Sequence, residues 1–146
     1  MTAAPRLFLD ASVFIAAAGS DTGASALTLA LGRQGHATPL ASRRVLLEAE
    51  RNIRIKLGSE ALLRFYEAIA ATDLVVVESP TPEEIAAHHH IIDPKDAHVL
   101  AAALKGAADV LLTLDRRHFM TPAVQGAGLP FLIMTPGEWL RRWLAT

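Results

Sequence analysis

The chain has 146 residues, the size of one domain with a single sizeable core. Hydrophobic residues make up 51% of it and charged residues 20%, which excludes an intrinsically disordered chain. Without cysteine there is no disulfide framework, thiolate zinc site or cysteine nucleophile. No apolar run approaches the roughly 20 residues of a membrane span, so we expect a cytoplasmic protein. The formal net charge of −1 neither favours nor excludes a nucleic-acid partner.

The first half of the chain alternates short apolar strands with helices. A buried strand is predicted over residues 6–9 and ends at Asp10. A helix over 23–33 and a strand over 37–41 follow. Ser42 is a good N-cap for a helix that runs to Lys56.

The second half continues the same alternation. A helix over 60–72 precedes a β-branched strand over 74–77, and a capping box begins a short helix at Thr81. The remaining predicted elements are a helix over 93–105, strands over 109–114 and 129–134, and a last helix over 136–144. We interpret residues 1–146 as one α/β domain, with a three-layer α/β/α arrangement around a mostly parallel sheet.

Two aspartates directly follow predicted strands. Asp10 comes after the first strand, and Asp115 comes after the strand that begins at Asp109. Parallel sheets place their sites outside the carboxyl ends of the strands. Each aspartate alone could equally be a turn residue or a helix cap. Their equivalent positions on separate strands favour a shared site.

A third acid lies near the start of a nearly apolar helix. Asp93 is interpreted as the N-cap of the helix over 93–105, which places Asp96 at its third position. The rest of that helix is almost wholly apolar, so it must be buried around most of its circumference. Asp96 is therefore expected near the core, where a carboxylate needs a partner. A metal ion would supply one.

Helix geometry separates two candidates for a fourth acid. At ~100° per residue, Glu48 lies at the rim of the apolar face of its helix, and Glu50 lies about 160° away. Glu50 is better placed to pair with Arg54, four residues further on. We therefore favour Glu48. Oxygen ligands of this kind suit Mg²⁺ or Mn²⁺, which can activate water and stabilise a leaving oxygen in phosphodiester hydrolysis.

Four segments, in this order, resemble the PIN-domain nucleases, a family that includes VapC-like toxins. They are Leu-Phe-Leu-Asp-Ala-Ser-Val-Phe-Ile at 7–15, Ser-Arg-Arg-Val-Leu-Leu-Glu at 42–48, Asp-Ala-His-Val-Leu-Ala-Ala-Ala at 96–103, and Asp-Val-Leu-Leu-Thr-Leu-Asp-Arg-Arg-His-Phe at 109–119. No single segment is specific, but together they span residues 7–119. The histidine run at 88–90 is not part of the pattern.

The resemblance implies a PIN-like fold and a Mg²⁺- or Mn²⁺-dependent endoribonuclease. It implies catalytic metal ligands at Asp10, Glu48, Asp96 and Asp115. Ser12 and Thr113 match positions where the family often has hydroxyls beside the metal site. An RNA substrate, a cognate antitoxin and a homodimer are the partners that the resemblance implies.

Basic residues near these segments have two interpretations. They could be a solvated surface, or they could bind the phosphates of RNA. The residues concerned are Arg43, Arg44, Arg51, Arg116 and Arg117. His98 lies two residues from Asp96, so the two side chains are expected to face apart on a helix, which argues against a catalytic role for His98.

Two other functions fit parts of the pattern. One is a phosphoaspartate-type phosphatase or phosphoacceptor domain, with Asp10 as nucleophile and Lys95 or Lys105 binding phosphate. The chain lacks the second aspartate that haloacid-dehalogenase-type phosphatases carry two positions after the nucleophile. The other is a non-catalytic PIN-like binding domain, which the presence of all four acids disfavours.

Overall fold

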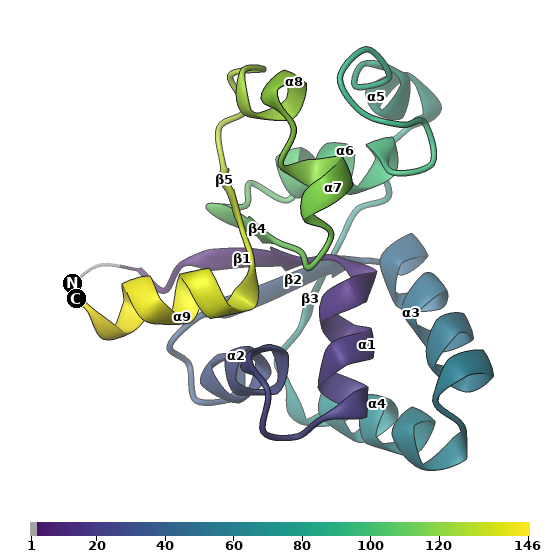
Figure 1. The fold of residues 1–146 in the computed structure, drawn as a ribbon, viewed down its shortest axis with the longest axis vertical. Coiled ribbons are helices and arrows are strands. Elements are labelled where there is room, and N and C mark those ends of the chain that lie inside the picture. Colours follow the sequence, from purple (N-terminus) through teal and green to yellow (C-terminus); the bar gives the residue numbers. More distant parts are fainter. Residues whose placement is uncertain (1–2) are drawn as a thin grey trace.

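The computed structural model describes residues 3–146 and contains one parallel sheet (Figure 1). The strands are β1 (Arg6–Leu9), β2 (Thr38–Ser42), β3 (Val75–Val77), β4 (Val110–Leu112) and β5 (Leu132–Met134). They lie in the order β3-β2-β1-β4-β5, and each neighbouring pair is parallel. Parallel neighbours need long crossover connections, which the intervening helices provide.

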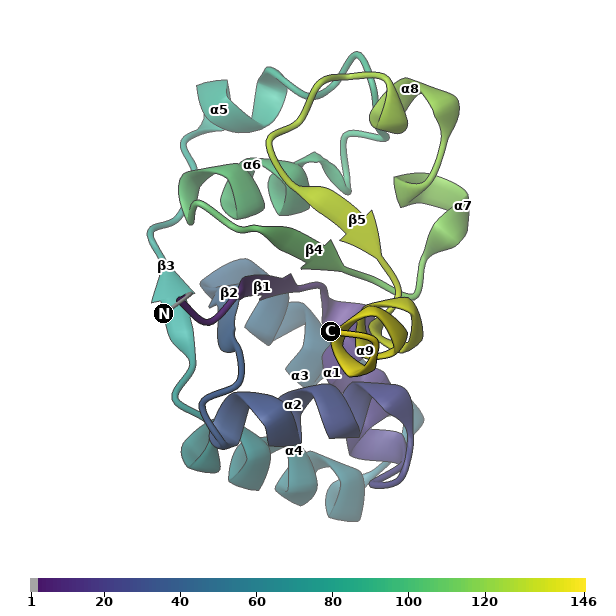
Figure 2. The same ribbon diagram turned by 90° about the vertical axis from the view of Figure 1, so that its left-hand side faces the viewer.

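Helices cover both faces of this sheet (Figures 1 and 2). On one face lie α1 (Ala11–Gly19), α2 (Ala24–Arg33), α3 (Arg43–Lys56), α4 (Ser59–Ala71) and α9 (Pro136–Leu144). On the other lie α5 (Pro82–Ala86), α6 (Ala97–Lys105), α7 (Arg116–Phe119) and α8 (Pro122–Gln125). This confirms the predicted three-layer α/β/α fold.

The two central strands form the middle of the core. Phe8 and Leu9 of β1 and Leu111 and Leu112 of β4 have no measurable exposure. A strand covered by helices on both faces buries consecutive side chains, which is why these strands are continuously apolar. The strand order also reverses here, because β2 and β3 lie on one side of β1, and β4 and β5 lie on the other. The gap between the ends of β1 and β4 is thus the switch point at which such sheets bind ligands.

Several predicted boundaries were wrong. Helix α1 was not predicted; it begins directly after Asp10, which caps it, and its mostly apolar sequence gives little amphipathic signal. The short helices α7 and α8 were also missed. The strands predicted over 109–114 and 129–134 are confined to three residues each, Val110–Leu112 and Leu132–Met134. The capping box at Thr81 is confirmed.

Within residues 3–146, no helix on its own has the length and apolar character to cross a membrane. Helices α1 and α2 meet that test only as a pair, by length and composition, with a bend of 101° between them.

Gly106 offers a test of the packing between α6 and the edge strand β3. A Cβ atom at this position would lie 2.5 Å from Cγ1 of Val77 and 3.3 Å from the carbonyl oxygen of Ala102. Gly106→Ala is therefore expected to lower the free energy of unfolding by about 1–3 kcal/mol through overpacking. Urea unfolding monitored by circular dichroism measures the loss. The control is Gly19→Ala, whose Cβ would make only an ordinary 3.6 Å contact with Leu57; equal losses in both variants would contradict the packing argument.

Candidate metal centre

Asp10 stands at the centre of the site, between the ends of β1 and β4. It is the N-cap of α1, and its Oδ1 accepts a hydrogen bond from the Ala11 N–H at 2.8 Å. Its Oδ2 accepts hydrogen bonds from Ser12 Oγ at 3.0 Å and from Thr113 Oγ1 at 2.8 Å. Only 8% of the residue is exposed. These bonds hold the carboxylate in one orientation.

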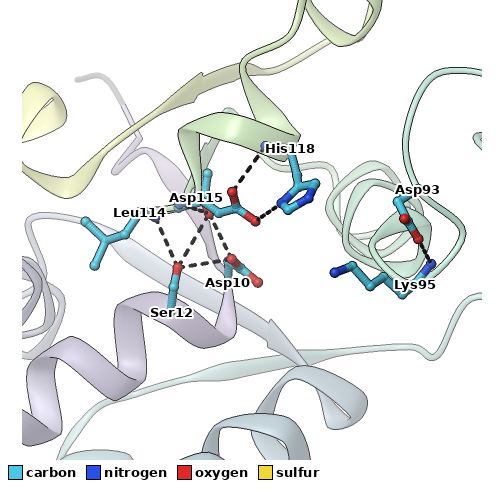
Figure 3. Close-up of polar contacts among 8 residues, drawn as sticks. Asp10, Ser12, Asp93, Lys95, Leu114, Asp115 and His118 are labelled. Carbon is cyan, nitrogen blue, oxygen red and sulfur yellow. Dashed lines mark hydrogen bonds and ion pairs between the residues drawn. The ribbon is translucent and has the colours of Figure 1, made fainter.

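The two hydroxyls also fix the chain that follows β4 (Figure 3). Ser12 Oγ accepts a hydrogen bond from the Leu114 N–H at 3.0 Å, and Thr113 Oγ1 accepts one from the Asp115 N–H at 3.1 Å. Each hydroxyl donates its own hydrogen to Asp10. Because strand β4 ends at Leu112, Asp115 is placed by this network and not by strand alternation.

Asp115 is in turn held by His118 (Figure 3). Oδ1 of Asp115 accepts the His118 backbone N–H at 3.1 Å, as the N-cap of α7, and Oδ2 lies 2.8 Å from Nδ1 of the imidazole. Each carboxylate oxygen has a second lone pair available. One ligand atom each from Asp96, Asp115 and His118 can be chosen so that all three lie within 4.8 Å of one another, close enough to share an ion.

Asp96 is placed differently from the prediction. Helix α6 begins at Ala97, so Asp96 is its N-cap residue and not its third residue. The preceding turn is closed by hydrogen bonds from the Asp96 and Ala97 N–H groups to the Asp93 carbonyl, and Asp93 Oδ1 accepts the Lys95 N–H at 3.0 Å. Asp93 therefore closes this turn and does not cap α6. The Asp96 side chain makes no capping hydrogen bond, and its Oδ2 is buried without a partner among the described residues.

Glu48 reaches the site from α3, where it approaches a buried histidine. Its Oε2 lies 3.9 Å from Nε2 of His98, whose side chain is only 4% exposed. Burial, and secondarily the charge of Arg44, lower the pKa of His98 to about 4. The imidazole is therefore neutral at pH 7, and the contact is not an ion pair. The predicted pairing of Glu50 with Arg54 is present, with a 3.3 Å separation.

Two adjoining hollows collect these side chains. The smaller, with a volume of about 210 Å³, is lined by all four predicted acids, Asp10, Glu48, Asp96 and Asp115. The larger, of about 610 Å³, shares the last three of these acids. Asn52 also lines both hollows, and the larger one adds Arg44, Leu47, Arg51, Lys95 and His98. The site thus consists of a cluster of four carboxylates with basic side chains beside it.

The electrostatics of the carboxylate cluster explain why it suits a cation. Burial is the main cause that raises the pKa of Asp10, Glu48 and Asp96, and neighbouring carboxylates raise all three further. A buried carboxylate oxygen usually accepts a hydrogen bond, but Oδ2 of Asp96 accepts none from residues 3–146. A hard divalent cation would supply the missing partner and offset the repulsion. The donor set consists of carboxylate oxygens with the imidazoles of His98 and His118 nearby, and it fits Mg²⁺ or Mn²⁺.

Comparison with known proteins identifies the family of the chain. The sequence pattern of the PIN domain matches residues 6–117. The chain belongs to the PIN domain family. The matched range includes Asp10, Glu48, Asp96 and Asp115, so all four acids lie within the PIN domain. Among curated proteins, no sequence matches the chain significantly.

Solved structures share the PIN-like fold at low sequence identity. The VapBC2 structure from Rickettsia felis, bound to a DNA fragment from its promoter, has a TM-score of 0.63 and 14% identity over 89% of this chain and 98% of that one. VapC20 from Mycobacterium tuberculosis, a toxin that cleaves the sarcin-ricin loop, has a TM-score of 0.57 and 18% identity over 84% and 95%. PAE2754 from Pyrobaculum aerophilum has a TM-score of 0.63 and 17% identity over 97% of each chain.

Of the basic residues predicted to bind RNA, some line the larger hollow and others do not. Arg44 and Arg51 line the larger hollow beside Glu48, with which they share one face of α3. Arg43 does not line it, and Arg116 forms a 2.8 Å ion pair with Glu138. Arg117 is exposed on α7.

Two residues that the sequence pattern did not place in the metal centre, His98 and Lys95, line the larger hollow. Lys95 extends from its turn in the direction of Asp115 and lines the larger hollow (Figure 3). His98 was expected to face away from Asp96, but it lines the same hollow as Asp96 and approaches Glu48 on another helix. A single histidine in an otherwise apolar helix was the signal available in the sequence, because a buried imidazole needs a polar partner.

The raised pKa of Asp96 predicts a specific dependence of stability on pH. In the metal-free protein the folded state holds the Asp96 proton more tightly than the unfolded state does. Ionised Asp96 therefore destabilises the fold above its ordinary pKa of 3.8, and this effect disappears at lower pH. We expect Asp96→Asn to raise the melting temperature by a few degrees at pH 7 in EDTA, and to have less effect as the pH falls toward 4. Scanning calorimetry at both pH values checks this; an Asp96→Asn variant that is less stable at pH 7 would contradict it.

Proposed function

We propose that this PIN domain is a Mg²⁺- or Mn²⁺-dependent endoribonuclease whose metal ligands are Asp10, Glu48, Asp96 and Asp115. The single observation that carries the proposal is the buried, unpartnered Oδ2 of Asp96, which lines a hollow with the other three carboxylates. Such an arrangement is unfavourable unless a cation joins it. All three layers of the fold contribute, since the acids come from the ends of β1 and β4 and from α3 and α6.

The roles of the residues follow from their surroundings. A divalent cation bound to these carboxylates would supply positive charge to a phosphodiester and lower the pKa of the attacking water. Ser12 and Thr113 keep Asp10 in a fixed orientation, and His118 does the same for Asp115. Arg44, Arg51 and Lys95 line the adjoining hollow and would bind phosphate groups of RNA on either side of the cleaved bond. Arg43, Arg116 and Arg117 would contribute less, because they do not line that hollow.

We also propose that the chain acts as the toxin of a toxin–antitoxin pair. The support is the likeness of the fold to VapC20 and to VapBC2, and the presence of the complete acidic set. An antitoxin segment would inhibit the enzyme by covering the hollow. Exposed apolar side chains on α3 and α4, among them Leu47, Ile55 and Leu63, would be covered by the antitoxin or by a second copy in a homodimer. A cytoplasmic location and action of residues 1–146 as one domain belong to the same proposal.

A phosphatase that uses Asp10 as its nucleophile is less well supported. Both oxygens of Asp10 accept hydrogen bonds, which hold the carboxylate and reduce its nucleophilicity. Lys105 is paired with Glu84 at 2.8 Å and does not line either hollow of the acidic site. No observation favours this function over hydrolysis of RNA.

The acidic set is tested by conservative substitution. Asp10→Asn, Asp96→Asn and Glu48→Gln should each reduce cleavage of RNA to background, because each removes a negative charge from the cation's ligands. The chain offers matched controls: Asp93→Asn retains the acceptor that closes its turn, and Glu50→Gln lies two residues from Glu48 but outside both hollows. Both controls should cleave at the wild-type rate. Cleavage that persists in EDTA, or a Glu50→Gln variant as inactive as Glu48→Gln, would overturn the proposal.

The proposed contact of Arg44 and Arg51 with phosphate groups is tested by the salt dependence of RNA binding. Arg44→Ala and Arg51→Ala, made in the inactive Asp10→Asn background, should weaken binding of an RNA oligonucleotide. Each should also lower the magnitude of the slope of log K against log salt by about 0.7, the contribution of one contact with a single-strand phosphate. Arg54→Ala is the control, since Arg54 lies on the same helix and pairs with Glu50. A slope unchanged by Arg44→Ala and Arg51→Ala would place the RNA elsewhere.

A further inference from the structure

His98 is a polar residue in an apolar part of the molecule. It belongs to α6, where every residue from Ala97 to Ala103 is buried, and only 4% of its side chain is exposed. Its ring Nδ1 is buried and has no hydrogen-bond partner among residues 3–146. Its Nε2 faces Oε2 of Glu48 at 3.9 Å. A histidine used only to fill space would be replaced at less cost by an apolar residue.

The Glu48 carboxylate, in turn, lacks a hydrogen-bond donor among residues 3–146. Half of its side chain is exposed, at 51%, and in the part of the chain that the structure describes no group donates a hydrogen bond to its carboxylate. Asp10 and Asp96 lie close enough to raise its pKa, so their charges also push the Glu48 carboxylate away. A long side chain in this situation tends to rotate into solvent. Asp10 and Asp115 are held by hydroxyls and by His118. The charges of Arg44 and Arg51 also act on the Glu48 carboxylate, but it accepts no hydrogen bond from residues 3–146, and the imidazole of His98 lies 3.9 Å away.

The surroundings of the imidazole favour a hydrogen on Nε2. A hydrogen on Nδ1 would be a buried donor without an acceptor, and the lone pair of Nε2 would then face a carboxylate. A hydrogen on Nε2 leaves only a bare lone pair at Nδ1 and points the N–H at Glu48. The second arrangement is favoured at both nitrogens.

We propose that His98 is a positioning residue of the metal centre, whose Nε2–H donates to the Glu48 carboxylate and holds it beside Asp96. The inference rests on the proposed function, because the held carboxylate is taken to be a metal ligand. The separation of 3.9 Å must shorten to hydrogen-bond length, which a rotation within the half-exposed Glu48 side chain allows. His98 thereby couples α6 to α3, the two helices that carry Asp96 and Glu48.

A double-mutant cycle tests whether His98 acts through Glu48. The proteins are wild type, His98→Leu, Glu48→Gln and the double variant, each titrated with Mn²⁺ by calorimetry after its fold is checked by circular dichroism. We expect His98→Leu to weaken Mn²⁺ binding by about 10-fold or more, as is usual for a residue that orients a metal ligand. In the Glu48→Gln background the same substitution should have no further effect. An equal loss in both backgrounds would overturn the inference.

Two further variants serve as a rescue and a control: His98→Gln and Glu50→Gln. The amide nitrogen of glutamine can take the place of Nε2, so His98→Gln should recover most of the affinity that His98→Leu loses, which a purely apolar packing role would not predict. Glu50→Gln should bind Mn²⁺ as the wild type does. Failure of the glutamine variant to recover affinity, while its fold is intact, would count against a donated hydrogen bond.

Nuclear magnetic resonance of the metal-free protein separates this inference from the proposed function. Long-range ¹H–¹⁵N correlation spectra should show the hydrogen of His98 on Nε2, with a resonance that moves in Glu48→Gln and does not move in Glu50→Gln. A hydrogen on Nδ1, or a resonance indifferent to Glu48→Gln, would overturn the inference. If the wild type shows the expected spectrum but binds no Mn²⁺, the metal-dependent function fails while the contact between His98 and Glu48 stands.

Discussion

The Thr113 hydroxyl donates a 2.8 Å hydrogen bond to Asp10 across the gap between the ends of β1 and β4, and the geometry of the whole site depends on this contact. Thr113 has no measurable exposure, and its oxygen also accepts the Asp115 N–H. One buried hydroxyl therefore sets the distance between two carboxylates that would otherwise repel. The sheet provides the location, because the strand order reverses between β1 and β4, and parallel sheets bind ligands beyond the carboxyl ends of the strands at such a point.

The carboxylates around this contact differ in how firmly they are held. Both oxygens of Asp10 and of Asp115 accept hydrogen bonds. Within residues 3–146, Oδ2 of Asp96 has no partner, and Glu48 lies 3.9 Å from His98 without a hydrogen bond to its carboxylate. A centre that held all of its acids rigidly without a cation would be strongly destabilised, since burial and mutual repulsion already raise the pKa of several of them. Asp10 and Asp115, which follow β1 and β4, are thus held by hydrogen bonds, whereas Glu48 on α3 and Asp96 at the start of α6 are held less firmly. Such a division suits a cation that binds and dissociates.

Placement of charge around the centre is asymmetric as well. Glu48, Asp96 and Asp115 line both hollows, but three basic side chains, Arg44, Arg51 and Lys95, line the larger one and only Lys56 among residues 3–146 lines the smaller. A net charge of −1 over the whole chain conceals this local distribution. A nucleic acid would respond to the local distribution of charge, because exposed charges beyond roughly 8 Å are screened at physiological salt.

Sequence alone determined the features that depend on neighbouring residues: the buried strands, the aspartates at their ends, the caps at Ser42 and Thr81, and the pairing of Glu50 with Arg54. These follow from apolar runs and from contacts three or four residues apart. Helix α1 and the start of α6 were not predicted correctly, because a mostly apolar helix has little periodicity and a hydrogen-bonded turn at Asp93 resembles a helix start. Only the tertiary structure decided that Arg44 and Arg51 line the hollow, that Asp96 Oδ2 is left without a partner, and that His98 meets Glu48. Each of these depends on how α3 and α6 lie relative to the sheet, and no local pattern in either helix encodes the other's position.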